Sequence, residues 1–276
     1  MNLFAEGTFH IVLHAEEVFT IGGISITNSM LLGWLVSAVL VGVFVWGAKR
    51  IKVRAGSKIV SLIELLCELV INLTASTMHD RKQAAKYAPF LITIFCFILF
   101  NNWFGLLPGV GTITINGVPL FRAWTADLTG TLAISISAIV MIQFLALRDM
   151  GAKNHLKHYF SDKPYNPINF FVGLLEILGE FTRMASLALR LFGNIFAGEV
   201  LLVVLSAITS FGSPAATLPF IVMELFVGFI QAFVFTMLVI VYLTLAVAHH
   251  GEDSETASDH SVQPTPVVAA GTVSGG

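Results

Sequence analysis

A permanent cation stands within a long apolar stretch of this sequence. Arg190 lies in the run SLALRLFGNIFAGE, residues 186–199, whose other side chains are uncharged until Glu199. A charged side chain at the centre of a membrane-spanning helix costs at least about 2.5 to 3.5 kcal/mol, so its presence calls for a function. Arginine stays protonated inside proteins and has no acceptor atom, so it can hold an anion or set a local potential but cannot relay protons. The sequence therefore marks Arg190 as a candidate gate or clamp for charge.

Acids and amides occur in the same stretch and in the apolar stretch that follows it. The acids are Glu199 and Glu224, and the amides are Asn194 and Gln231. Ionisable residues within membrane-spanning helices are rare and mark ion paths, so the two acids are candidate proton carriers, although they could instead cap polar contacts between helices. The two amides are open to a second interpretation, because interhelical hydrogen bonds use the same side chains.

No acid of its own helix is placed to neutralise Arg190. At about 100° per residue, Glu176 shares a helical stripe with Arg190, but it lies fourteen residues away. Glu199 points nearly the opposite way and lies about 13.5 Å further along the axis. A hairpin that turns near Gly212 brings Glu199 and Glu224 to a similar depth, which leaves Glu224 off the level of Arg190. The favoured counterion is therefore an acid of another chain.

The composition places these residues in a membrane protein. Charged residues make up 12% of the 276 and hydrophobic residues 56%, with a mean hydropathy of +0.84. Globular domains carry roughly twice that share of charge. The sequence contains no phosphate-binding loop, zinc-ligand spacing, nucleophile elbow or dinucleotide fingerprint, so neither an enzyme active site nor a metal or organic cofactor is expected.

Apolar stretches long enough to cross a bilayer define the expected fold. We expect an all-α polytopic membrane protein with about five transmembrane helices and one amphipathic interfacial helix, in which the last two long, tilted helices form a hairpin. The interfacial helix is expected over 59–80, where Glu64, Glu68 and Asn72 form one stripe. Residues 206–218 have turn composition, and Pro219 suits the first turn of the last helix. The expected transmembrane helices are 29–48, 87–107, 125–147, 167–205 and 219–248.

Basic residues set the expected orientation. Most of the fifteen Lys and Arg residues follow the first expected span, the interfacial helix or the span 125–147, which places these three segments in the cytoplasm. Residues 1–28 are then an extracytoplasmic amino-terminal arm, residues 29–248 the membrane domain, and residues 249–276 a disordered cytoplasmic tail. The loop of about 108–124 lies outside, with Arg122 as its single basic residue.

The arginine motif and the glutamine helix together resemble subunit a of bacterial F-type ATP synthase. The resemblance rests on the run 186–199 and on the segments QAFVF from Gln231 and VYLT from Val241. The segments NWFGLLP from Asn102 and ADLTGT from Ala126 are similar to earlier motifs of the family. The likeness covers about residues 27–248, and it implies a non-catalytic stator subunit of a proton channel in ATP synthesis.

Site roles follow from the resemblance, position by position. In the family, the arginine matching Arg190 faces the essential carboxylate of each c subunit as the c-ring rotates, and two offset aqueous half-channels bring protons to and from that carboxylate. The inner half-channel approaches Glu176, near Ser186 and Tyr242. The outer half-channel is lined by positions matching Asn194, Glu199, Glu224 and Gln231, with Asn102 on the same side. The position of Glu224 is histidine in some members, so the order of proton hand-offs between the two glutamates stays open.

The resemblance also implies partners and a location. The expected partners are the c-ring and the b subunits of the peripheral stalk, with membrane lipid around the helices and no nucleic acid. The expected location is the bacterial inner (plasma) membrane, with the amino terminus outside and the carboxyl terminus in the cytoplasm.

Two other functions compete with this interpretation. A secondary transporter would use Arg190 to clamp a substrate anion, but it predicts internal repeats and a helix broken by Gly or Pro at mid-membrane, and the sequence has neither. A scaffolding membrane subunit without an ion path would leave the intramembrane acids unexplained.

Overall fold

The computed structural model describes residues 17–21, 24–50, 58–107, 110, 114–115, 118–150, 167–208 and 214–248. Six long helices occupy most of these ranges, and each is long and apolar enough to cross a membrane. This confirms the expected all-α polytopic membrane class. The helices are α1 (Asn28–Arg50), α2 (Lys58–Met78), α3 (Arg81–Gly105), α4 (Leu128–Met150), α6 (Pro167–Ile208) and α7 (Pro214–Ala248).

Short strands and one 3-10 turn complete the described chain. Strands β1 (Glu17–Ile21) and β2 (Ile24–Thr27) form an antiparallel hairpin that leads directly into α1, and β4 (Thr114–Ile115) pairs with β5 (Val118–Pro119) in the loop after α3. The turn η1 (Trp124–Ala126) precedes α4. The amino-terminal arm thus contains a hairpin that the sequence did not predict. The remainder of the arm, and the tail 249–276, lie outside the described residues.

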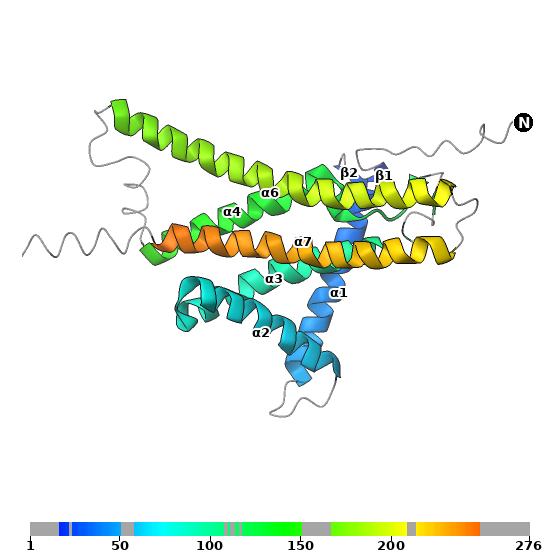
Figure 1. Cartoon of the computed structure of the whole chain (residues 1–276), viewed down its shortest axis with the longest axis horizontal. Helices are drawn as coiled ribbons and strands as arrows, with labels where there is room; N and C mark the ends of the chain where they lie inside the picture. Colours follow the sequence, from blue (N-terminus) through cyan, green and yellow to red (C-terminus); the bar gives the residue numbers. More distant parts are fainter. Residues whose placement is uncertain are drawn as a thin grey trace, which may run out of the picture.

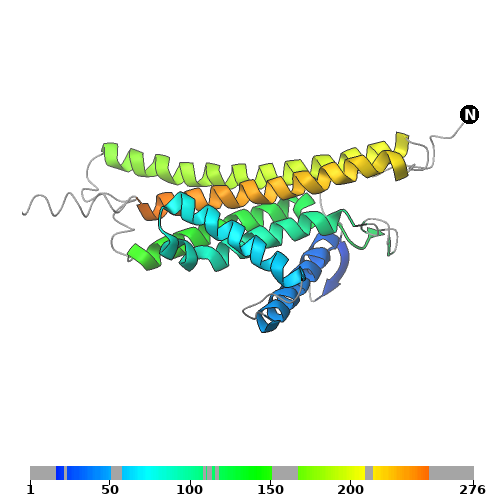
Figure 2. The ribbon, with the colours of Figure 1, turned by 60° about the horizontal axis from the view of Figure 1, so that its bottom comes forward.

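The last two helices form the predicted hairpin and lie on a layer made by α3 and α4. Figures 1 and 2 show α6 and α7 running side by side over most of their length, with the first part of α6 diverging from α7 in Figure 1. Helix α6 has 42 residues, about 63 Å at 1.5 Å per residue, so it must tilt or extend past the bilayer surface. The core between the helices contains the large buried side chains of Tyr87, Leu91, Phe95, Leu187, Phe235 and Ile240.

Helix α2 crosses α3 obliquely in both views. Its exposed face carries Glu64, Glu68 and Asn72 beside Leu62 and Leu65. This mixed face suits a helix at the membrane surface, although its length and hydropathy also meet the requirements for a span. Its interfacial position therefore stays a prediction.

The start of α7 differs from the prediction. The helix begins at Pro214, five residues before Pro219, and α6 continues to Ile208, so the predicted start at Pro219 was wrong. The first backbone N–H groups of a helix have no intrahelical acceptor, which makes Pro214 a favourable first residue. Pro219 lies inside α7, where it removes one hydrogen bond near the helix end but does not stop the helix.

The segment before α4 is anchored on both sides. The Asp127 carboxylate accepts hydrogen bonds from the Thr129 N–H at 3.1 Å and from the Ser29 hydroxyl at 3.0 Å. The Trp124 ring packs so closely on Gly33 and Gly130 that a Cβ at either glycine would lie 2.9 Å from it. Asp127 thus caps α4 and ties it to the start of α1.

Candidate functional site

The register between α6 and α7 is set by three contacts along the hairpin. The Glu224 carboxyl group lies where a Cβ of Gly198 would be. Further from the turn, the Asn194 amide donates to Gln231 Oε1 at 3.5 Å. Further still, the Arg183 guanidinium lies over the Tyr242 ring, 5.2 Å from its centroid, a cation–π geometry. Glu224 is therefore level with the Gly198–Glu199 turn of α6, in agreement with the similar depth expected from the sequence.

Helix α3 adds a third side to this polar region. Asn102, which is buried, donates from Nδ2 to the Gly228 carbonyl of α7 at 3.1 Å, and the Trp103 indole N–H donates to the Leu225 carbonyl at 3.1 Å. These bonds hold α3 against α7 beside Glu224 and Gln231. The structure therefore gathers Asn102, Asn194, Glu224 and Gln231 where α3, α6 and α7 meet.

Several buried polar atoms of this group have no hydrogen-bond partner among the described residues. They are Asn102 Oδ1, Glu224 Oε1 and Gln231 Nε2. Leaving such a group unsatisfied costs about 1 to 3 kcal/mol. Buried polar atoms of this kind are commonly satisfied by ordered water.

Arg190 lies on the exposed side of α6, about one helical turn before Asn194. Its side chain is exposed, as are Ser186, Leu189, Gly193 and Ala197 on the same side of the helix, whereas Leu187 and Leu191 are buried. Within the described ranges, Arg190 has neither an ion pair nor a hydrogen bond to another side chain. Glu199, the acid of α6 whose side chain is described, lies on Arg122 instead.

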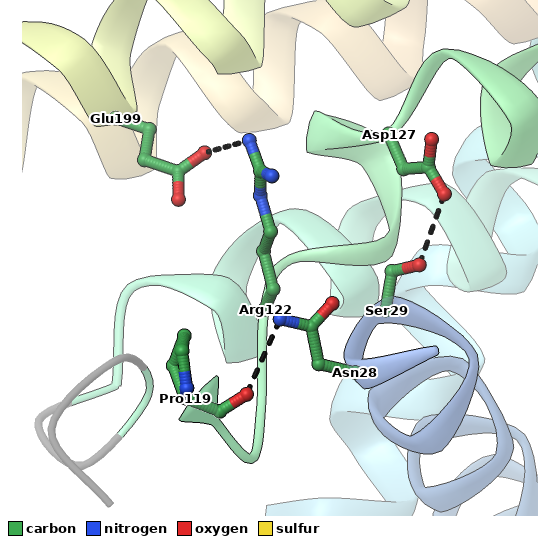
Figure 3. A network of polar contacts seen from close by, with 6 residues as sticks. All are labelled: Asn28, Ser29, Pro119, Arg122, Asp127 and Glu199. Carbon is green, nitrogen blue, oxygen red and sulfur yellow. Dashed lines mark hydrogen bonds and ion pairs between the residues drawn. The ribbon is translucent and has the colours of Figure 1, made fainter. Parts of the chain in front are cut away.

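Glu199 has a partner that the sequence did not reveal. Its Oε2 atom lies 3.4 Å from Nη2 of Arg122, and the two side chains are 40% and 10% exposed. Figure 3 shows Arg122 reaching from the segment before η1 toward Glu199 on α6. The sequence feature that could have indicated this contact is Arg122 itself, the single basic residue of an otherwise uncharged outer loop. Because Arg122 and Glu199 are 77 residues apart, the sequence did not show that they meet.

Comparison with known proteins identifies the family. The family of the ATP synthase A chain matches residues 30–244 of this sequence. The chain belongs to the ATP synthase subunit a family. It is similar to the ATP synthase subunit a of Desulforamulus reducens, with 32% identity over 244 residues that make up 86% of each protein. It is also similar to that of Stutzerimonas stutzeri, with 32% identity over 233 residues, 80% of this chain and 78% of the relative.

Some relatives are considerably longer than this chain. The ATP synthase subunit a of Anaeromyxobacter dehalogenans (strain 2CP-C) is 36% identical over 237 residues, which are 82% of this chain but only 59% of that protein. The family match, residues 30–244, nonetheless runs from the first turn of α1 to the last turns of α7. The chain is therefore a multi-pass membrane protein of the ATP synthase subunit a family.

The predicted site residues do not all lie together in the structure. Asn102, Asn194, Glu224 and Gln231 lie together, and Glu199 lies one residue past Gly198 with its carboxylate on Arg122. Arg190 lies on the exposed side of α6. The backbone at Glu176 is helical, but its side chain lies outside the described residues.

Proposed function

We propose that this chain is the stator half of the ATP synthase proton channel, in which Arg190 faces the carboxylates of a rotating ring of c subunits. The observation that carries the proposal is the exposure of Arg190 on a helix that can span the membrane, without an ion pair in the described part of the chain. A guanidinium in an apolar medium needs an anion nearby. The anion is best supplied by another subunit that lies against this side of α6.

The surroundings of Arg190 suit a moving partner. Ser186, Gly193 and Ala197 are small and exposed, and a Cβ at Gly193 would have no neighbour within 4 Å. Small residues let helices approach closely. A ring of c-subunit helices can therefore pass near this side of α6 and bring each carboxylate to the guanidinium.

The chemistry at Arg190 is electrostatic. A guanidinium beside a carboxylate favours the ionised carboxylate, so a c-ring carboxylate releases its proton on reaching Arg190 and takes up another before it returns to lipid. Because arginine keeps its own proton, it also prevents direct leakage between two offset half-channels. Each charge that crosses the membrane potential supplies about 2.3 kcal/mol per 100 mV, which drives rotation.

The polar group where α3, α6 and α7 meet is the outer half-channel in this proposal. Besides Asn102, Asn194, Glu224 and Gln231, the half-channel includes Glu199. The two glutamates take up and release protons, and the amides supply hydrogen-bonding groups between their level and that of Arg190. The inner half-channel approaches the c-ring from the cytoplasm near Glu176.

Assembly and orientation complete the proposal. The subunit performs no bond chemistry itself and works with the c-ring and with the b subunits of the peripheral stalk in the bacterial inner membrane. Residues 1–28 lie outside, residues 29–248 form the membrane domain, and residues 249–276 extend into the cytoplasm.

Inverted membrane vesicles that contain the assembled complex provide the test. Arg190→Ala should abolish ATP-driven acidification while the subunit still co-purifies with the c-ring. Arg81→Ala, at an exposed arginine in the first turn of α3, is the matched control and should pump normally. Normal pumping by Arg190→Ala would remove the gate role. Binding of a small anion by the isolated chain, abolished in Arg190→Ala, would favour the transporter instead.

A further inference from the structure

We propose that Arg122 is a positioning residue of the proton path, which holds the Glu199 carboxylate in place through their ion pair. The inference rests on the proposed function, because it gives Glu199 a role in proton transfer. The pair joins Nη2 of Arg122 to Oε2 of Glu199 at 3.4 Å. Arg122 comes from the loop between α3 and α4, whereas Glu199 belongs to α6, so the pair sets where the acid lies relative to the rest of the bundle.

The backbone that carries Arg122 is itself fixed. Asn28, at the first residue of α1, donates from Nδ2 to the Pro119 carbonyl at 3.2 Å. On the other side of Arg122, the Ala126 N–H donates to the Ala123 carbonyl at 3.0 Å, and the Asp127 carboxylate accepts from Ser29. Figure 3 shows the Asn28–Pro119 and Ser29–Asp127 bonds near Arg122. The buried arginine is thus held by a rigid support that includes the starts of α1 and α4.

Arg122 is the only described basic group close enough to Glu199 to be its counterion. Among the described residues on the elements packed around this end of α6, the other charged groups are Glu224 and Asp127. Asp127 is engaged by Ser29 and by the Thr129 N–H, and Glu224 lies against Gly198. Both are acids, so neither can balance the charge of Glu199.

Unequal exposure distinguishes this pair from a purely structural bridge. The Glu199 side chain is 40% exposed and that of Arg122 is 10% exposed, so the carboxylate keeps an open side while the cation is fixed. Solvent screens the pair on the open side of the carboxylate, which lowers its contribution to stability there. A proton acceptor, in contrast, must be held in reach of its donor and of the next acceptor. The geometry therefore favours a role in placing the acid.

The test compares four variants of the assembled complex in inverted vesicles, with ATP-driven acidification and c-ring co-purification as the two readouts. Arg122→Gln should lower the acidification rate by about tenfold, the usual size of a charge-assisted contact, without loss of the c-ring. Arg122→Lys should retain most of the rate, because a single N–O contact needs a cation but not a planar fork. Glu199→Gln should also lower the rate. The double variant Arg122→Gln with Glu199→Gln should be no worse than the poorer single variant.

The outcomes separate this inference from the proposed function. Normal pumping by Arg122→Gln together with slow pumping by Glu199→Gln would overturn the positioning role and leave the proton path standing. Independent, multiplicative losses in the double variant would also overturn it, as would loss of the c-ring in Arg122→Gln. Normal pumping by Glu199→Gln would instead remove Glu199 from the proposed path, and the inference with it.

Discussion

The carboxyl group of Glu224 on α7 occupies the space that a β-carbon of residue 198 on α6 would fill. Glycine at this position therefore allows a buried acid to lie directly against the backbone of the neighbouring helix. The Glu224 side chain is only 5% exposed, so its location depends on this close approach. The absence of a side chain at Gly198 thus determines where Glu224, a proposed proton carrier, can lie.

Replacement of Gly198 by alanine should displace the Glu224 carboxyl group. Alanine is the better helix former by about 1 kcal/mol, so a weaker α6 cannot explain a loss of function. We expect the rate of ATP-driven acidification in inverted vesicles to fall by about 10- to 100-fold, as for other small misplacements of reacting groups. Gly42→Ala on α1, where the new methyl group meets no neighbour within 4 Å, is the control and should pump normally. Equal rates in the two variants would contradict this reading of Gly198.

Glu224→Gln should separate proton transfer from packing. Glutamine has nearly the shape of glutamate, so the contact with Gly198 persists while the titratable group is lost. Passive proton flow through the assembled complex should fall by about 100-fold, at the lower end of what a positioned acid–base group contributes. The measurement is vesicle proton flux together with the amount of complex recovered, with Glu64→Gln on the exposed face of α2 as the control. Loss of the assembled complex would point to a structural role for Glu224.

Arg190→Lys should fail although it keeps a positive side chain. An ammonium group in apolar surroundings can lose its proton, and it lacks the planar array of donors that a guanidinium presents to a carboxylate. ATP synthesis by energised vesicles should therefore drop to the background level. The corresponding exchange Arg81→Lys should leave synthesis unchanged. Near-normal synthesis with lysine at position 190 would show that charge alone is sufficient there.

Gly193→Leu should test the side of α6 that carries Arg190. Space is open around this glycine within the described chain, so the isolated subunit should accommodate leucine and reach the membrane in normal amount. A c-ring packed closely against this side would meet the new side chain, and most of the c-ring should be lost from the purified complex. Gly42→Leu is the matched control, at an exposed and equally open glycine of α1. Retention of the c-ring in Gly193→Leu would indicate that the ring lies elsewhere.

Much of the fold could be predicted from the sequence because hydropathy is a local property. A run of apolar residues long enough for the bilayer predicts a helix wherever it occurs, and the paired long helices at the end of the chain appear as α6 and α7. The separation of Arg190 from Glu199 on the same helix could also be predicted, because helical spacing fixes which residues share a side. The approximate register between α6 and α7 could be predicted once the hairpin was assumed to turn near Gly212.

The tertiary structure decided the contacts between segments that are distant in the chain. The pair of Arg122 with Glu199 spans 77 residues, and the bond from Asn102 to Gly228 spans 126. No helical period relates such positions, so they follow only from how the helices pack. The start of α7 at Pro214 was also not fixed by local preference, because both Pro214 and Pro219 suit the first turn of a helix.

The sequence by itself therefore determined that the chain forms helices long and apolar enough to cross a membrane and that one of them carries Arg190, because hydropathy acts on each segment separately. Only the folded bundle decided which acid faces which helix, which glycine admits Glu224, and which arginine holds Glu199, because those choices depend on side chains meeting across helices.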